Sequence, residues 1–129
     1  MPAYARALSQ RDVFIAKMER FLADWDAWLV PVAALPAYPH VPSRNPIEQL
    51  WATVEVDGQK IPYLMATSVY TGLCSLTGNP VVVLPLGLTK AELPIGVQVV
   101  GRRWADMALL AVAEQLVQVT GQFQHPPGT

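Results

Sequence analysis

The sequence predicts an α/β fold, in which a few strands of a mixed β-sheet are packed by helices. Residues 81–84 are a continuous run of Val and Leu, which is typical of a strand covered on both faces. Residues 95–100 alternate, with Ile, Val and Val on one face and Gly, Gln and Val on the other. Apolar residues recur at helical spacing in three further segments: 2–23, 61–76 and 106–120.

The first third of the chain predicts a helix, a short strand and a loop. Residues 2–23 carry an apolar stripe with the charged residues largely off it. The run 28–30 is apolar and stops at Pro31, which predicts a buried strand. Five prolines lie in or just before residues 32–47, which predicts an extended surface loop because proline fixes φ and lacks a donor.

The rest of the chain predicts a turn, two helices and two strands. Asp-Gly at 57–58 indicates a tight turn, and Pro62 is acceptable in the first turn of the helix 61–76. We expect Pro85 to end the strand 81–84, residues 86–93 to form an exposed connection, and Pro94 to begin the next strand. We expect Asp106 to be the N-cap of the next helix and Gly121 to end it, with the helix lying along the sheet. Residues 122–129 are interpreted as a tail. Gly96 would let another backbone approach closely.

The composition favours an association with another chain or segment. The 129 residues fit a single domain, 1–129, yet 52% are hydrophobic and only 15% are charged. Because a domain of this size has a limited interior, we infer that part of the apolar surface faces a partner. We therefore expect at least a dimer, or a contact with a larger part of the same protein.

Other classes of function are disfavoured. A net charge of −1 gives no basic footprint for nucleic acid. Residues 61–89 lack charge, but prolines and glycines interrupt them, so we interpret them as a buried helix and strand rather than a membrane span. The single cysteine, Cys74, excludes an internal disulfide and fits a reducing compartment, so we expect a cytoplasmic protein.

An ordered set of short motifs runs along the chain. It comprises Gly78-Asn79-Pro80, a strand ending in Pro85, Leu93-Pro94-Ile95-Gly96-Val97-Gln98 and Gly101-Arg102. Upstream of it lie Tyr4, Ala7, Leu8 and Arg11 in the first helix, with Asp26 and Pro31 around the first strand. This pattern resembles the C-terminal part of the amidase signature family of serine hydrolases. The resemblance covers most of the chain but only about the last third of a typical member, and it implies hydrolysis of a carboxamide to a carboxylate and ammonia or an amine.

The resemblance does not supply catalytic residues. It implies a serine nucleophile, a second serine on a cis peptide bond and a lysine base, the serines lying in a Gly/Ser-rich segment upstream of the matched part. This sequence contains no such segment. Its serines are Ser9, Ser43, Ser68 and Ser75, and its lysines, interpreted as solvated, are Lys17, Lys60 and Lys90. We therefore predict no catalytic residue here and no activity of the chain alone.

Alternative chemistries are weakly supported. Cys74 with His40 or His125 could form a cysteine hydrolase pair, but a cysteine in an apolar helix usually acts as a small hydrophobe. Two histidines without a nearby Cys, Asp or Glu group do not make a metal site, so we expect neither metal nor cofactor. Asp24 and Asp26 are interpreted as a helix end rather than an acid–base pair.

Candidate substrate-binding residues lie on one edge of the helix 61–76. They are Tyr63, Thr67, Tyr70 and Thr71. The loop 32–47 is a second candidate, because the resemblance implies that it shapes the acyl-binding side of a pocket. We expect core packing rather than a pocket role for Trp25, Trp28, Trp51 and Trp104, and an internal hydrogen bond for Gln98.

Two hypotheses remain open. In the first, the chain is part of an amidase and supplies sheet, helices and pocket wall to the missing N-terminal amidase portion. In the second, it is a non-catalytic, truncated relative that folds by self-association as a homo-oligomer.

Overall fold

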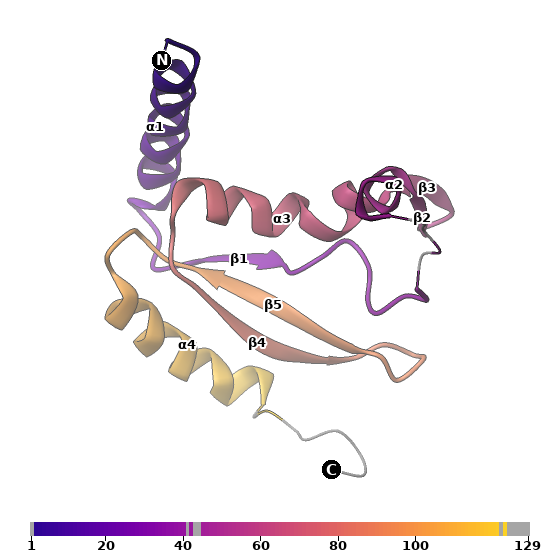
Figure 1. Ribbon diagram of the computed structural model, residues 1–129. Coiled ribbons are helices and arrows are strands. Elements are labelled where there is room, and N and C mark those ends of the chain that lie inside the picture. The colour runs from indigo at the N-terminus through magenta and orange to yellow at the C-terminus, as the bar shows by residue number, and fades with distance from the viewer. Residues whose placement is uncertain (1, 41, 43–44, 122, 124–129) are drawn as a thin grey trace.

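The computed structural model describes residues 2–40, 42, 45–121 and 123 (Figure 1). Its elements, in chain order, are α1 (Pro2–Leu22), β1 (Trp28–Pro31), α2 (Pro46–Trp51), β2 (Thr53–Val56), β3 (Gln59–Pro62), α3 (Tyr63–Thr77), β4 (Val81–Leu88), β5 (Pro94–Val100) and α4 (Asp106–Thr120). One sheet has the order β1-β5-β4 and the other is the β2-β3 hairpin. Pairing is antiparallel in both sheets. The predicted α/β class is confirmed.

The main sheet lies between two helices (Figure 1). On one face Leu84 and Val99 pack against Leu109 and Ala113 of α4. On the other face Val30 and Val100 pack with Cys74 of α3. Residue alternation along a strand sends neighbouring side chains to opposite faces. The adjacent Val99 and Val100 of the central strand, both 0% exposed, therefore anchor two separate cores.

Pro85 does not end its strand as the sequence suggested, whereas β1 does stop at Pro31, as predicted. β4 continues past Pro85 to Leu88, with a register shift between Pro85 and Gly87. Pro31 belongs to β1 and lies opposite Val97. Both strands are edges of the sheet, where a residue without an N–H can be accommodated on the unpaired side or at a bulge.

The region before α3 differs from the prediction in two ways. The predicted turn is confirmed, with Asp57 and Gly58 at φ 50° and 77° between β2 and β3. Residues 61–62 pair with β2 as the end of β3, so α3 begins at Tyr63 rather than at 61. The helix α2 was not predicted, although Asn45 accepts a hydrogen bond from the Glu48 N–H (2.8 Å) as its N-cap.

Helix α4 covers the sheet as predicted, but its first turn differs. The N-cap is Ala105, and Asp106 is already the first helical residue. Its carboxylate is still favourable there because the N-terminus of a helix is electropositive. Gly121 ends the helix as predicted, at φ 88°, with its N–H bonded to the Val117 carbonyl (2.9 Å).

A polar junction joins α1, the end of α3 and the end of β5. Asn79 Nδ2 donates to the Gly101 carbonyl (2.8 Å), and the Gly101 N–H donates to the Pro80 carbonyl (3.0 Å). Glu19 Oε1 accepts from Asn79 Nδ2 (3.4 Å) and from the Arg103 N–H (3.3 Å). The glycine, asparagine and proline after α3 therefore have a structural use in this chain.

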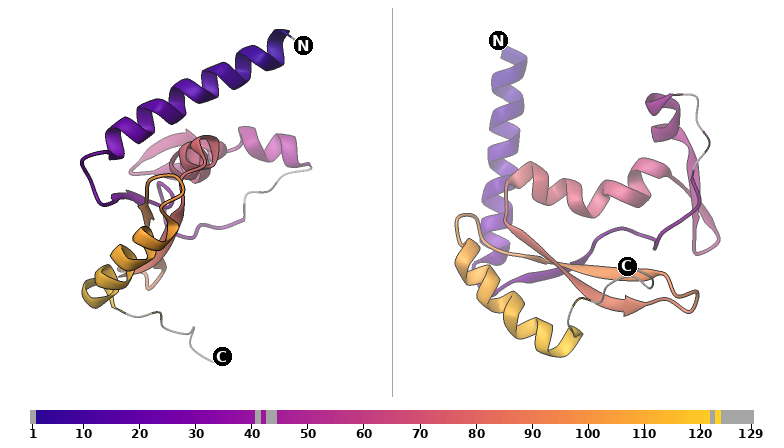
Figure 2. Two further views of the ribbon diagram at one scale, coloured as in Figure 1. Left: turned by 90° about the vertical axis from the view of Figure 1, so that its left-hand side faces the viewer. Right: turned by 60° about the horizontal axis from the view of Figure 1, so that its bottom comes forward.

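The same junction fixes α1. Arg11 Nε donates to the Leu76 carbonyl (2.7 Å), near the point where Gly78 turns the chain at φ 73°. Of the described side chains of α1, only Met18 and Leu22 are buried. Residues 2–10 are exposed, and this half of the helix projects from the body of the molecule (Figures 1 and 2).

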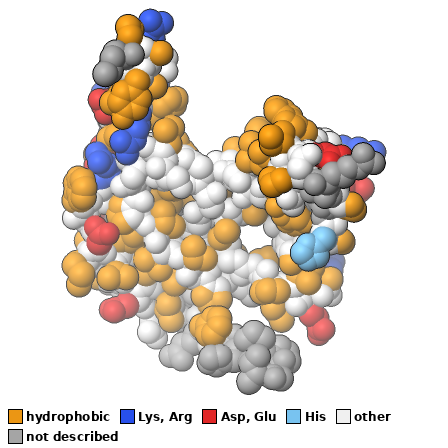
Figure 3. All heavy atoms as spheres, viewed as in Figure 1, with side chains coloured by type: hydrophobic (Ala, Val, Ile, Leu, Met, Phe, Trp, Pro, Cys, Tyr) orange, Lys and Arg blue, Asp and Glu red, His pale blue; other side chains and the backbone are white. Residues whose placement is uncertain are grey.

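Many large hydrophobic side chains are exposed, and Figure 3 shows them spread over one face of the molecule. Three of the four tryptophans are exposed, which contradicts the expectation of core packing for them: Trp25 at 61%, Trp51 at 79% and Trp104 at 86%. Trp104 has the Arg103 guanidinium over its ring, 5.2 Å from the centroid, but remains exposed. In the part of the chain that the structure describes, no helix is both long and apolar enough to cross a membrane.

Candidate functional site: an apolar groove at the end of the sheet

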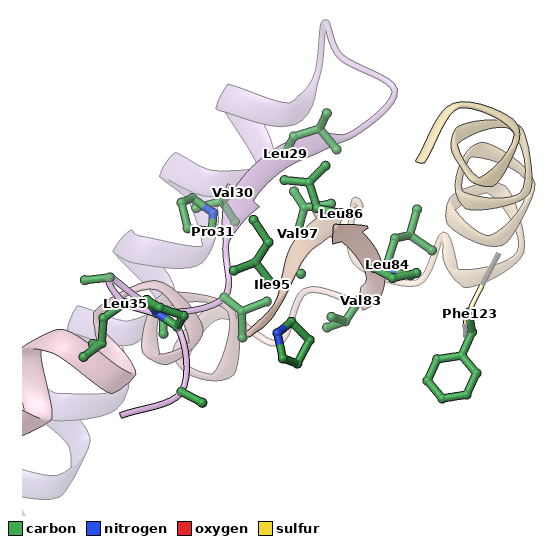
Figure 4. A pocket seen from close by; sticks show the side chains of 18 residues that line it. Leu29, Val30, Pro31, Leu35, Val83, Leu84, Leu86, Ile95, Val97 and Phe123 are labelled. Carbon is green, nitrogen blue, oxygen red and sulfur yellow. The ribbon is translucent and has the colours of Figure 1, made fainter. Parts of the chain in front are cut away.

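A groove of about 740 Å³ lies where β1 leaves the sheet and the chain turns toward α3 (Figure 4). Its lining is entirely hydrophobic residues, prolines and one glycine: residues 29–37, 83–86, 94–97 and Phe123. Three strands and the first part of the predicted loop thus meet at one surface. Such a surface favours an apolar group over a charged one.

Backbone and ring contacts hold the loop in place. The Ala34 N–H donates to the Ala66 carbonyl of α3 (2.9 Å). Farther along, the rings of Tyr38 and Tyr63 meet edge to face, with centroids 5.8 Å apart. A hydrogen bond with Tyr63 and partial burial raise the pKa of Tyr38 above its ordinary value. The loop is therefore attached to α3 at two points.

Gly96 lines the groove at a point where the neighbouring strand leaves little room for a side chain. A Cβ added there would lie 3.2 Å from the Leu84 carbonyl oxygen and 3.3 Å from Val83 Cγ1, with Val32 Cγ2 at 3.7 Å. The expected close approach of another backbone at Gly96 is confirmed, since the neighbouring strand is the nearest contact. The missing side chain also leaves room for the loop to pass over the sheet.

The four predicted binding residues of α3 lie beside this groove rather than in it. Tyr63 contacts the loop, and Tyr70 packs against the cluster of Val30, Cys74 and Val100. The two threonine hydroxyls bond helix carbonyls: Thr67 to Tyr63 (2.9 Å) and Thr71 to Ser68 (3.3 Å). None of the four lines the apolar groove.

Sequence reasoning missed the groove's sheet residues. Leu86 and Ile95 line it, together with Val83. Taking Pro85 as the end of a strand placed Leu86 in an exposed connection and concealed its position on the sheet. The signal that could have found it is the alternation that resumes after Pro85.

A second hollow of about 530 Å³ lies between the C-terminal half of α3 and the sheet. Thr71 is the only one of the four predicted residues that lines it. Gln98 also borders it, but Nε2 of this residue donates to the Pro31 carbonyl (2.8 Å) and its side chain is 3% exposed. The predicted internal hydrogen bond of Gln98 is confirmed.

The described residues do not assemble a nucleophile and a base. Ser9 and Ser75 donate to helix carbonyls, and Ser68 contacts the Thr67 hydroxyl. Cys74 is buried, and desolvation raises the pKa of its thiol, so it behaves as the small hydrophobe predicted. Lys17, Lys60 and Lys90 are exposed, as predicted.

The remaining candidates divide between the surface and the residues that the structure does not describe. His40 is exposed, and His125 and Ser43 lie outside the described residues. Among the described residues, no three His, Cys, Asp or Glu side chains come close enough together to hold a metal ion. The groove thus offers shape and apolar surface rather than proton transfer.

This chain is similar to known proteins in sequence and in fold. The sequence profile of the amidase family matches residues 1–110. A glutamyl-tRNA(Gln) amidotransferase chain of Pseudothermotoga lettingae is 31% identical over 110 residues, which are 85% of this chain and 20% of that protein. A fatty acid amide hydrolase of Medicago truncatula is 37% identical over 75 residues, 58% of this chain and 12% of that protein. An amidase of known crystal structure superimposes with a TM-score of 0.77 at 29% identity, covering 92% of this chain and 25% of that one. The chain thus spans about a fifth of the amidotransferase chain and a quarter of the crystallised amidase.

Proposed function

Because this chain belongs to the amidase family, we propose that it acts as the C-terminal portion of an amidase-like hydrolase that converts a carboxamide and water into a carboxylate and ammonia or an amine. Its contribution is the sheet β1-β5-β4, the helices on both faces and one wall of the substrate pocket. The serine nucleophile, the second serine and the lysine base belong to a segment or chain that this sequence does not contain. The chain alone is inactive.

The observation that carries the proposal is the apolar groove beside α3. Apart from Phe123, its lining residues come from β1, the proline-bearing loop, β4 and β5, so the sheet and the loop attached to α3 position them. Catalysis of amide cleavage needs a nucleophile and its base in place, and the described lining of the groove contains neither kind of side chain. A wall that contacts the acyl part of an amide needs only shape and apolar surface, which the groove has.

The four residues of α3 fit the edge of such a wall. Tyr63 touches the loop at Tyr38, and the hydroxyls of Thr67 and Thr71 lie on the same side of the helix. We propose that Tyr63, Thr67, Tyr70 and Thr71 support the loop and border the substrate, and that the loop itself meets it.

Labelling with a fluorophosphonate serine-hydrolase probe tests the catalytic part of the proposal. We expect no adduct by intact mass after incubation of the purified chain, because no described serine has an activating base. A serine hydrolase of known activity serves as the positive control. A stoichiometric adduct on any of the four serines would show that the chain carries its own nucleophile, and would contradict the proposal.

A second candidate function, self-association as a non-catalytic relative, is favoured by the amount of exposed surface. The chain exposes 9804 Å², whereas a compact monomer of 14.1 kDa exposes about 6,700 Å². The eleven residues outside the described ranges account for at most about 1,700 Å² of the difference. Well over 1,000 Å² of surplus remains, and a standard interface needs about 800 Å² from each partner.

Light scattering coupled to size exclusion tests this candidate. We expect the purified chain to have the mass of a dimer or a larger oligomer at micromolar concentration, because many large hydrophobic side chains are exposed. A mass of 14.1 kDa across the concentration range would contradict self-association and leave membership of the amidase family unaffected.

A further inference from the structure

Helix α3 is apolar on two sides, and only one of them is covered. Tyr63–Thr77 contains no charged residue. Ala66, Cys74 and Thr77 are buried toward the sheet. A second stripe, turned by about 120° from the buried one and here called the outer face, carries Met65 at 54%, Val69 at 48% and Leu76 at 41% exposure. The outer face carries neither charged nor hydroxyl side chains, and exposed apolar surface of this kind marks a contact with another chain or segment.

Gly72 lies in the middle of that outer face. Glycine within a helix is less favourable than alanine because it loses more conformational freedom. A Cβ added at Gly72 would have no atom within 4 Å, so packing inside this chain does not require a glycine. The residue instead leaves a notch in an otherwise apolar surface.

The spacing of these residues is self-complementary. In an antiparallel pair of α3 helices related by a twofold axis between residues 70 and 71, Val69 of each copy lies opposite Gly72 of the other. The same axis sets Met65 of each copy opposite Leu76 of the other. Each copy thus presents one projecting side chain and one notch to its mate, which is what an isologous interface requires.

We propose that a second copy of this chain packs on the outer face of α3, antiparallel, with Val69 in the notch at Gly72. This inference rests on the self-association described above and names its surface. No charge is buried, because α3 has none, and the antiparallel helix dipoles attract each other.

The two ends of α3 support this arrangement. α1 contacts α3 near its C-terminal end, through Arg11 and Leu76, while α2 lies near its N-terminal end (Figure 1). Antiparallel pairing therefore brings α1 of each copy toward α2 of the other. Both helices present large exposed apolar side chains: Tyr4 and Leu8 on α1, and Ile47, Leu50 and Trp51 on α2. Figure 3 shows hydrophobic side chains on both of these projections.

Sedimentation of three variants tests the interface. Val69→Glu places a charge in the contact, and Gly72→Leu fills the notch while favouring the helix. Val119→Glu is the matched control, since Val119 is 86% exposed on α4, away from α3. We expect wild type and Val119→Glu to dimerise, and Val69→Glu and Gly72→Leu to dimerise at least tenfold more weakly with helical circular dichroism retained. Gly72→Leu keeps the test decisive should Val69→Glu fail to fold.

Cross-linking tests the register. Met65→Cys and Leu76→Cys chains, each also carrying Cys74→Ala, are mixed and treated with a short bis-maleimide. We expect the mixed cross-linked dimer to exceed either homodimer severalfold. A wild-type monomer would overturn both this interface and self-association. A dimer that survives Val69→Glu and Gly72→Leu, or equal cross-linking of all pairs, would overturn the interface alone.

Discussion

At the scale of single residues, burial decides what the one thiol can do. Cys74 is 4% exposed between α3 and the sheet, and its pKa is raised above the model-compound value of 9.0 because the thiolate would lose its hydration. The folded state therefore disfavours the thiolate. Its contribution to stability is constant below pH 9 and falls as the pH rises above that value.

Reaction with Ellman's reagent at pH 8 measures this protection. We expect Cys74 of the folded chain to react at least about 100-fold more slowly than in denaturant, since the reagent needs an exposed thiolate. Cys74→Ala with Ser75→Cys is the matched control, because Ser75 is the exposed neighbour on the same helix. Equal rates for the two chains would show that Cys74 is accessible, and would contradict the burial described here.

Single residues also show where sequence reasoning succeeds. The internal hydrogen bond of Gln98 and the close approach at Gly96 follow from their places in a buried strand. The exposure of Trp51 and Trp104 could not be predicted, because residue type indicates a preference for burial without showing whether this chain provides the covering layer.

At the scale of elements, the β2–β3 hairpin depends on two left-handed residues. Asp57 and Gly58 have φ of 50° and 77°, and the turn that needs both favours Asn-Gly and Asp-Gly. We expect Asp57→Asn to leave stability unchanged or slightly raised. Gly58→Val should cost about 1–2 kcal/mol, because a β-branched residue resists positive φ. Urea unfolding followed by circular dichroism measures both, and equal midpoints for the two variants would contradict the turn geometry.

Most elements could be predicted because their signals are local. The helical spacing of apolar residues predicted α1, α3 and α4, and the apolar or alternating runs predicted β1, β4 and β5. The length of β4 could not be predicted, since whether Pro85 ends a strand depends on its place at the sheet edge. The groove was hidden for the same reason, because it forms where residues separated by about sixty positions meet.

At the scale of the whole molecule, one polar junction holds the projecting helix to the sheet. Asn79 bonds the Gly101 carbonyl and Glu19, and so connects α1, the end of α3 and the end of β5. We expect Asn79→Ala to cost about 1–3 kcal/mol, because the buried carbonyl of Gly101 loses its donor. Gln10→Ala, on the exposed part of α1, is the control and should change stability by less than about 0.5 kcal/mol.

Urea unfolding measures the difference in the free energy of unfolding between the two variants. If the dependence of this free energy on urea concentration is the same, the shift in midpoint reports the difference. A wild-type midpoint for Asn79→Ala would show that the junction does not hold α1 to the sheet. A loss of α1 alone would appear as a smaller slope, because less surface would then be exposed on unfolding.

The pairing of the first strand with the central one has a consequence for synthesis on the ribosome. Trp28 and Pro31 lie opposite Val100 and Val97, so β1 has no partner until about seventy further residues have been made. The hairpin β4–β5 is local and closes first, whereas the closure of β1 onto it encloses a long loop and comes late. During translation the apolar β1 segment therefore stays unpaired, and a chaperone that binds such segments has its longest opportunity there.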